Sequence, residues 1–272
     1  MPKFPTTTIG GYEVSRLLCG TNPFRGYSHF SSARDNWLRK YFTVERAVEV
    51  MAVCDGYGIN GIVSGPEEFV YEAIQGLERQ TGSKWIWFCT PGMGSQPIDD
   101  GVRWAADHGA QFCMPHTSWT DSRLNIKDCR IDDLEPAIEL TRRLGMVPGL
   151  STHRPEVITV ADAAGYDVET YIQPFNVAGF LCAVETDWVE RVIRSAKKPV
   201  ICIKPFAAGR VMVRPGFNFV YNHCKPVDTV CAGFMSPEEA EEDIRIALGV
   251  LEGTDQGVQL TQSRSKQTLV AP

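Results

Sequence analysis

Short apolar runs alternate with longer amphipathic segments along the chain. The runs that predict strands are Leu17–Thr21, Ile59–Ser64, Trp85–Thr90, Gln111–Pro115, Val147–Ser151, Val168–Pro174, Val200–Lys204 and Thr229–Gly233. Between them, apolar residues recur at helical spacing. Eight strand–helix units in strict alternation predict an α/β fold, a parallel sheet closed into a (β/α)8 TIM barrel. An open doubly wound sheet is the alternative, but CGTNPFRG after the first strand lacks the glycine-rich phosphate motif of such sheets.

The pattern predicts one barrel domain over residues 1–252, with long loops after the first and fourth strands. The first loop, RGYSHFSSARDNWLRKYF, contains several aromatic residues, so we expect a folded lid rather than a disordered segment. Residues 253–272 are polar and are predicted to form a C-terminal tail outside the barrel.

Composition and charge narrow the classes of partner. The net charge of −6 and the pI of about 5.5 argue against binding to nucleic acid or to an anionic membrane. No stretch approaches the roughly 18 apolar residues of a membrane span, and the segment MPKFPTTTIGG has no apolar signal core. We therefore expect a cytoplasmic protein that binds a small molecule, and a homo-oligomer remains open.

The chain contains nine cysteines and no CxxC spacing. Five of them lie inside predicted strands: Cys19, Cys89, Cys113, Cys202 and Cys231. A cysteine buried singly behaves as a small hydrophobic residue, so we predict packing rather than disulfides or metal binding for these positions.

Titratable residues follow several predicted strands. Barrel enzymes place their active sites at the carboxyl ends of the strands. His116 and His153 follow the fourth and fifth strands, Asp121 lies one loop beyond His116, and Lys204 ends the seventh strand. We predict these four residues as the catalytic group.

A divalent metal is one alternative for the two histidines. Consecutive barrel strands are neighbours about 5 Å apart, so His116 and His153 can approach each other. With Asp121 they would supply three ligands and leave one position for water or substrate. The competing interpretation is that each histidine only forms a hydrogen bond with a loop.

Lys204 is predicted to face the barrel mouth. Period-two alternation places Val200, Cys202 and Lys204 on one face of their strand. If the first two point into the barrel, the lysine does so too, and a charged group there needs a partner. It could bind an anion or form a Schiff base with a carbonyl compound, or it could pair with Glu67, Asp121 or Glu185.

Four further residues are predicted to bind substrate. Asn22 and His29 follow the first strand, Asn176 follows the sixth, and Arg210 lies in the AAGR segment after the seventh. Arginine grips anions with two parallel hydrogen bonds, and barrel phosphate sites often use the loops after the last two strands.

Three segments carry a resemblance to a family. EVSRLLCGTNPF, GYGINGIV and VDTVCAGFMSPEEAEEDI resemble the corresponding parts of the aldo-keto reductases. The resemblance implies their barrel, their order of strands and a nicotinamide cofactor, NADP. The segments NPFRGYSH, HRPE and KPFAAGR also resemble a group of uncharacterised barrel proteins.

The resemblance does not extend to the reductase active site, which has an aspartate, a tyrosine, a lysine and a histidine. His116 falls at the position of the histidine. Val63 stands at the position of the aspartate, no tyrosine follows where the family has one, and the third strand, WIWFCTP, contains no lysine.

We therefore expect an enzyme whose site lies at the carboxyl ends of the strands. Acid–base chemistry on a small polar or anionic substrate, such as a sugar or a keto acid, is the first prediction, with a lyase, isomerase or hydrolase as the reaction class and a divalent metal as a conceivable cofactor. The alternatives are an NADP-dependent reductase with an atypical proton donor and a barrel that binds a ligand without catalysis.

Overall fold

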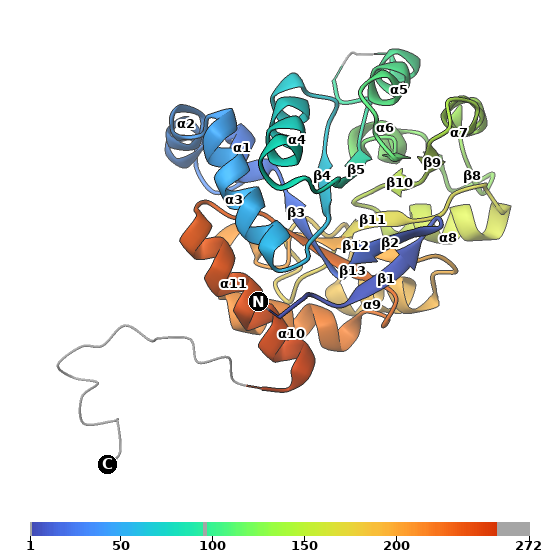
Figure 1. Ribbon diagram of the computed structural model, residues 1–272. Coiled ribbons are helices and arrows are strands. Elements are labelled where there is room, and N and C mark those ends of the chain that lie inside the picture. Colours follow the sequence, from blue (N-terminus) through green and yellow to red (C-terminus); the bar gives the residue numbers. More distant parts are fainter. Residues whose placement is uncertain (1, 95–96, 255–272) are drawn as a thin grey trace.

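Eight strand positions form a closed parallel barrel, as the sequence predicts (Figure 1). The computed structural model describes residues 2–94 and 97–254. The barrel strands are β3 (Leu17–Gly20), β4 (Gly61–Ser64), β5 (Ile86–Cys89), β6 (Phe112–Cys113), β9 with β10 (Val147–Pro148 and Leu150–Ser151), β11 (Tyr171–Pro174), β12 (Val200–Ile203) and β13 (Thr229–Ala232). β6 pairs with β9 and β10 pairs with β11, so the two halves of the fifth strand close the ring.

The fifth strand is divided because the chain at Gly149 approaches its neighbours closely. A Cβ atom at Gly149 would lie 2.8 Å from the Cε of Met114 and 2.8 Å from the main-chain oxygen of Thr170. Only glycine leaves room for this approach, and the predicted strand Val147–Ser151 therefore appears as two short pieces.

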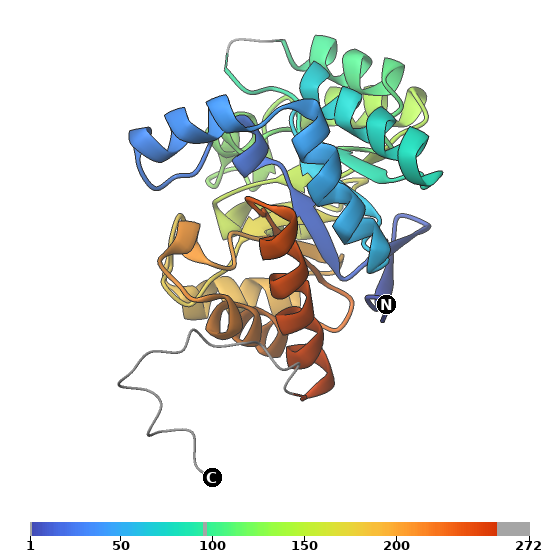
Figure 2. The same cartoon turned by 60° about the vertical axis from the view of Figure 1, so that its left-hand side comes forward.

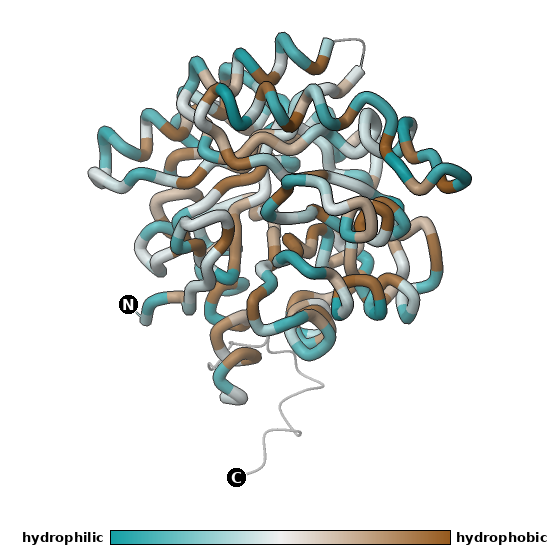
Figure 3. The backbone as a smooth tube through the Cα atoms, turned by 90° about the vertical axis from the view of Figure 1, so that its right-hand side faces the viewer, coloured by the Kyte–Doolittle hydropathy of each residue, from teal (hydrophilic) through white to brown (hydrophobic). Residues whose placement is uncertain are grey.

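Helices surround the strands. The eight that alternate with the barrel strands are α3 (Val44–Gly56), α4 (Glu68–Thr81), α5 (Ile98–Asp107), α7 (Leu134–Arg143), α8 (Pro155–Ala164), α9 (Thr186–Ser195), α10 (Val213–His223) and α11 (Pro237–Glu252). The first and last of them, α3 and α11, lie side by side and bring the two ends of the barrel sequence together (Figure 2). Hydrophilic and hydrophobic residues alternate along these helices, which is the pattern of helices buried on one face (Figure 3).

Two hydrophobic layers lie on opposite faces of the sheet. The inner cluster contains residues of most barrel strands, among them Leu18, Phe88, Phe112, Ile172 and Ile201, and Val63 of β4 packs against it. The outer cluster joins the alternate strand residues to the helices. All nine cysteines are free thiols, and the five in the strands are buried, so the prediction that they pack as small hydrophobic residues is confirmed.

An N-terminal hairpin that the sequence analysis missed packs against the inner layer. β1 (Thr6–Ile9) and β2 (Tyr12–Ser15) pair across Gly10 and Gly11, which both adopt positive φ. Ile9 is buried in the inner cluster together with Val14. The Gly-Gly pair between two β-prone runs is the signal that could have predicted this hairpin.

The loop after β3 is folded, as expected for a lid, but it contains helices rather than irregular chain. α1 (Asn22–Arg25) follows the strand directly, and α2 (Ser32–Tyr41) begins where the Ser31 hydroxyl accepts a hydrogen bond from the Arg34 N–H. The loop after β6 contains α6 (Thr117–Ser122) and a small hairpin, β7 (Leu124–Asn125) and β8 (Arg130–Ile131).

The predicted C-terminal tail falls almost wholly outside the described residues. α11 ends at Glu252, and Gly253 follows in the left-handed conformation that commonly ends a helix. From residue 255 on, the tail remains a prediction from the sequence. Among residues 2–94 and 97–254, no helix combines the length and the apolar character needed to cross a membrane.

Candidate functional site

A cavity of about 590 Å³ lies at the carboxyl ends of the barrel strands. His116, His153 and Lys204 line it, where the fourth, fifth and seventh strand positions end. Glu239 and Asp243 of α11 line it as well. The volume is within the roughly 300–1,000 Å³ of small-molecule sites, so the cavity can take a ligand of substrate or cofactor size.

Lys204 faces this cavity, although not for the reason that the alternation implies. Val200 and Cys202 belong to the outer layer, whereas Ile201 and Ile203 face the barrel interior, so the premise of the prediction was wrong. Lys204 adopts φ 62°, a left-handed conformation that interrupts the alternation of the strand. The lysine therefore lines the cavity directly after an inward-facing residue.

The pKa of Lys204 is lowered from its ordinary value, mainly because burial disfavours the ammonium ion. None of the hydrogen bonds or ion pairs between described residues includes its Nζ atom, and the predicted pairing with Glu67, Asp121 or Glu185 is absent among them. A lysine with a lowered pKa at a barrel mouth is a candidate proton donor or nucleophile.

His116 ends the fourth strand position and caps α6, where the sequence placed it. Its Nδ1 accepts a hydrogen bond from the Ser118 N–H at 3.2 Å and lies 2.8 Å from the Ser118 hydroxyl. With Nδ1 as acceptor, the ring proton of the neutral imidazole is on Nε2. Burial and the charge of Lys204 lower the pKa of His116, so the imidazole is neutral at pH 7 and presents an N–H donor.

His153 lies beside His116, as the adjacency of their strands predicts. The pKa of His153 is lowered to about 4, mainly by burial and then, in decreasing order, by electrostatic repulsion from Lys204, His116 and His29. Besides burial, the charge of Lys204 lowers the pKa of His29, His116 and His153. The cavity therefore holds a cluster of three imidazoles and one amine.

Asp121 supports the two histidines from outside the cavity. Its carboxylate accepts hydrogen bonds from the Thr117 hydroxyl at 2.9 Å, from the Thr152 hydroxyl and from the His153 main-chain N–H at 3.0 Å. Both of its oxygens therefore accept hydrogen bonds from protein donors, so Asp121 has a positioning role that needs no metal. The prediction of a metal site at His116, His153 and Asp121 is not supported, since the described residues contain no group of three His, Cys, Asp or Glu side chains that could hold a metal.

Of the four predicted substrate-binding residues, Asn22 and His29 line the cavity. The side chain of Asn176 is instead buried and forms two hydrogen bonds with the main chain of Phe180, so it shapes the loop after β11. Arg210 donates to the main-chain oxygens of His29 and Ala207 and lies over the Phe180 ring. It joins two loops at the rim rather than lining the cavity.

Sequence reasoning missed the part of the cavity beside α11. Glu239 accepts a hydrogen bond from the Met235 N–H while its own N–H donates to the Ser236 hydroxyl. This capping box was evident in the sequence, but it indicated only where a helix begins. Asp243 follows Glu239 by four residues, so it places a second carboxyl on the same face of α11. This spacing is visible in the sequence and could have indicated the shared face.

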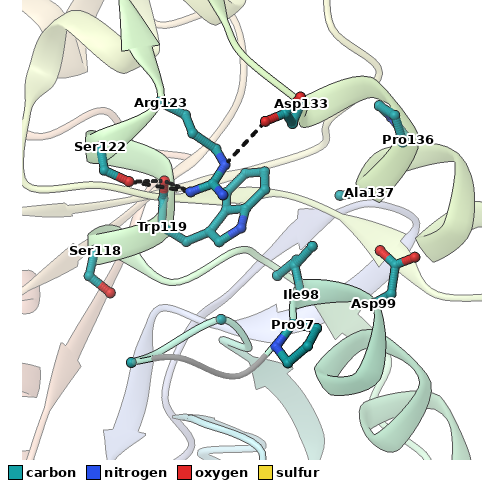
Figure 4. A pocket seen from close by; sticks show the side chains of 12 residues that line it. Pro97, Ile98, Asp99, Ser118, Trp119, Ser122, Arg123, Asp133, Pro136 and Ala137 are labelled. Atoms are coloured by element: carbon teal, nitrogen blue, oxygen red, sulfur yellow. Dashed lines mark hydrogen bonds and ion pairs between the residues drawn. The ribbon is translucent and has the colours of Figure 1, made fainter.

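A second cavity of about 640 Å³ lies outside the barrel between α5, α6 and α7 (Figure 4). Its most polar wall is Arg123, which lies over the Trp119 ring and forms an ion pair with Asp133 at 3.8 Å. It is built by helix flanks rather than strand ends, so we assign the site to the barrel mouth.

The neutral histidines predict a pH dependence of stability. Because the pKa of His153 is about 4 in the folded chain and 6.5 ordinarily, the unfolded chain binds a proton that the folded chain does not between these values. The free energy of unfolding should therefore fall by about 2 kcal/mol between pH 7 and pH 5 on account of this residue. Urea denaturation at both pH values, for the wild type and for His153→Gln, measures it. An equal loss in the variant would contradict the assignment.

Comparisons with known proteins place the fold among reductase barrels. No protein-family model matches the sequence, and the search of curated proteins returns no match. A candidate aldo-keto reductase from Pseudomonas aeruginosa superposes with a TM-score of 0.66 at 17% identity, over 90% of this chain and 95% of that one. An aldo-keto reductase from Klebsiella pneumoniae, solved with NADPH, gives 0.61 at 15% identity over 99% and 94%, and one from Brucella melitensis gives 0.58 at 12% over 98% of each.

These identities show the fold alone, an aldo-keto-reductase-like TIM barrel, and confirm that part of the sequence resemblance. The structure also locates the departures from the family's active site. Val63 lines the cavity at the end of β4, where the resemblance implies an aspartate, and the lysine of the cavity is Lys204 on the seventh strand position rather than one on the third.

Proposed function

We propose that this chain is an enzyme that reduces a carbonyl group of a small substrate in the cavity at the barrel mouth. The observation that carries the proposal is the position of Lys204, turned into the cavity beside two neutral imidazoles on a reductase-type barrel. The sequence placed lyase, isomerase or hydrolase chemistry first. The neighbours of the same fold are named reductases, so the alternative is better supported and takes the first place.

Lys204 would act as the proton donor that the missing tyrosine provides in the family. Its ammonium ion can hydrogen-bond to the substrate carbonyl oxygen and give up a proton as negative charge develops there. The lowered pKa makes this transfer easier than from an ordinary lysine. The Nε2–H of His116 would be a second donor to the same oxygen, and His153 would remain neutral beside the ammonium ion.

A nicotinamide cofactor, which the fold neighbours imply, would supply the hydride when bound. The mouth fits an uncharged planar ring, because Ile172, Ile203 and Phe180 form apolar walls next to Lys204. These residues would hold the ring, and Lys204 would hold the substrate oxygen. In this arrangement the Lys204 amine and the His116 imidazole bind the carbonyl oxygen and move protons, and the hydride comes from the cofactor.

A lyase that forms a Schiff base on Lys204 is the second candidate. The observation that favours it is the same lowered pKa of Lys204, since burial increases the fraction of neutral, nucleophilic amine. Trapping with borohydride in the presence of keto sugars and keto acids, followed by mass spectrometry of the peptide that contains Lys204, distinguishes it from a reductase.

The proposed function is tested by direct binding and turnover. We expect NADH or NADPH to quench the intrinsic tryptophan fluorescence saturably. We also expect members of a panel of aldehydes, ketones and keto sugars to oxidise the bound cofactor, which is measured as a loss of absorbance at 340 nm. Saturable binding without turnover of any carbonyl compound would favour a barrel that only binds ligands. Absence of binding by both cofactors would overturn the reductase proposal.

A further inference from the structure

His153 is held in place by its main chain, while its imidazole faces the cavity. Its main-chain N–H donates to the Asp121 carboxylate at 3.0 Å, and its carbonyl oxygen accepts from the Gln173 side-chain amide at 3.5 Å. The residue lines the cavity, and no hydrogen bond or ion pair of its ring occurs among residues 2–94 and 97–254. A neutral imidazole has one N–H donor and one acceptor nitrogen. This fixed ring can therefore donate a hydrogen bond to a ligand in the cavity.

The ammonium ion of Lys204 acts on His153 and has no counter-ion at hydrogen-bonding distance in the described part of the chain. The carboxyl groups that line the cavity are otherwise engaged or uncharged. Glu67 forms an ion pair with an arginine, and Glu239 accepts a main-chain hydrogen bond at the beginning of α11. The pKa of Asp243 is raised to about 8, mainly by burial, so this carboxyl is mostly protonated at pH 7. A charge that is removed from water is costly unless it is paired, so an anionic ligand would stabilise the ammonium ion.

This single cation determines the charge and the shape of the anion. A monoanion neutralises one ammonium ion, whereas a phosphate dianion would leave a second negative charge against the apolar walls Ile172 and Ile203. In the proposed reduction, Lys204 also binds the carbonyl oxygen. An ammonium ion has three N–H donors, so it can contact the carbonyl oxygen and a carboxylate oxygen together when the carboxylate is bonded to the carbonyl carbon. The two oxygens then lie on one edge of the substrate.

We propose that the substrate is a 2-oxo carboxylic acid, whose carboxylate accepts hydrogen bonds from the Lys204 ammonium ion and from the imidazole N–H of His153. The inference rests on the proposed function and names its substrate class, with His153 as the residue that selects for the carboxylate. The carbonyl carbon accepts a hydride from the reduced nicotinamide cofactor, and the carbonyl oxygen accepts a proton from Lys204. The products are a 2-hydroxy acid and the oxidised cofactor, and the neutral amine regains a proton from solvent.

Binding of pyruvate and of pyruvamide to the full-length protein tests the inference without turnover. The two compounds share the carbonyl group and differ in charge. Calorimetric titrations are made with the protein alone and with an excess of oxidised cofactor, which cannot supply a hydride. We expect pyruvate to bind about 10- to 100-fold more tightly, the range of a hydrogen bond to a charged group. Equal affinities, or no measurable binding of pyruvate under either condition, would overturn the inference.

Variants of His153 connect this preference to one side chain. His153→Leu removes the N–H donor and should lower the ratio of the two affinities about tenfold, whereas His153→Gln retains an N–H donor and should keep part of the preference. The matched control is His223→Gln, because His223 lies on α10 and pairs with Glu190 rather than lining the cavity. A purely structural role of His153 would weaken both compounds alike, so an unchanged ratio in His153→Leu contradicts the inference. If circular dichroism shows that His153→Leu is unfolded, His153→Phe, which retains a ring of similar shape, takes its place.

The outcomes for the two proposals can be distinguished. Equal affinities for pyruvate and pyruvamide, together with reduction of uncharged carbonyl compounds, would overturn the inference and leave the reductase proposal in place. A preference for pyruvate that depends on His153, without reduction of any carbonyl compound, would overturn the reductase proposal, while the recognition of 2-oxo acids would stand.

Discussion

Replacement of Lys204 by methionine is expected to lower kcat/KM for carbonyl reduction by about 10²–10⁴-fold, the range that a general acid contributes. Methionine has a similar length but can neither donate a proton nor carry charge. Steady-state kinetics at pH 7 with the best carbonyl substrate measures the effect. Binding of the cofactor should change little, because the ammonium ion is assigned to the substrate oxygen.

The matched control is Lys198→Met, which removes a lysine that is paired with Glu169 on the outside of the barrel. It should keep full activity. Lys204→Gly adds a second readout: glycine accommodates the positive φ at this position without strain, so the free energy of unfolding should rise by about 1 kcal/mol while activity is lost. Activity of Lys204→Met within threefold of the wild type would remove Lys204 from the mechanism.

The architecture could be predicted from the sequence because it depends on repeated, local patterns. Eight apolar runs separated by amphipathic segments leave few topologies, and the strand ends then locate His116, His153 and Lys204 at one mouth. The lysine shows the limit of such reasoning. Its orientation depends on the left-handed conformation of Lys204 itself. Period-two alternation predicted the right location for the lysine, although it assigned the inner and outer faces of the strand the wrong way round.

Long-range hydrogen bonds were beyond the sequence for a different reason. Asp121, predicted as a ligand or a catalytic partner, engages Thr152 and His153, residues more than 30 positions away, and nothing local specifies that pairing. The carboxyl groups of α11 were visible as a helix start, but which side of the helix faces the cavity is fixed by packing against α3 and α10. In this chain, local sequence patterns therefore predict the fold better than they predict the arrangement of the site, because long-range contacts place the side chains of the site.

Asp121→Ala is expected to destabilise the chain by on the order of 3 kcal/mol, the second large effect. The substitution removes the acceptor of three hydrogen bonds and leaves the Thr117 hydroxyl, the Thr152 hydroxyl and the His153 N–H without it. Urea denaturation at pH 7 gives the free energy of unfolding.

The control for this loss is Asp132→Ala, which breaks an exposed ion pair with Arg130 and should cost less than about 1 kcal/mol. Asp121→Asn separates charge from shape: it retains one acceptor oxygen but turns a donor toward donors, so its stability should fall close to that of the alanine variant. A loss in Asp121→Ala no larger than in the control would mean that water replaces the carboxylate. The positions of His116 and His153 would then have to be maintained by α6 and β10 alone.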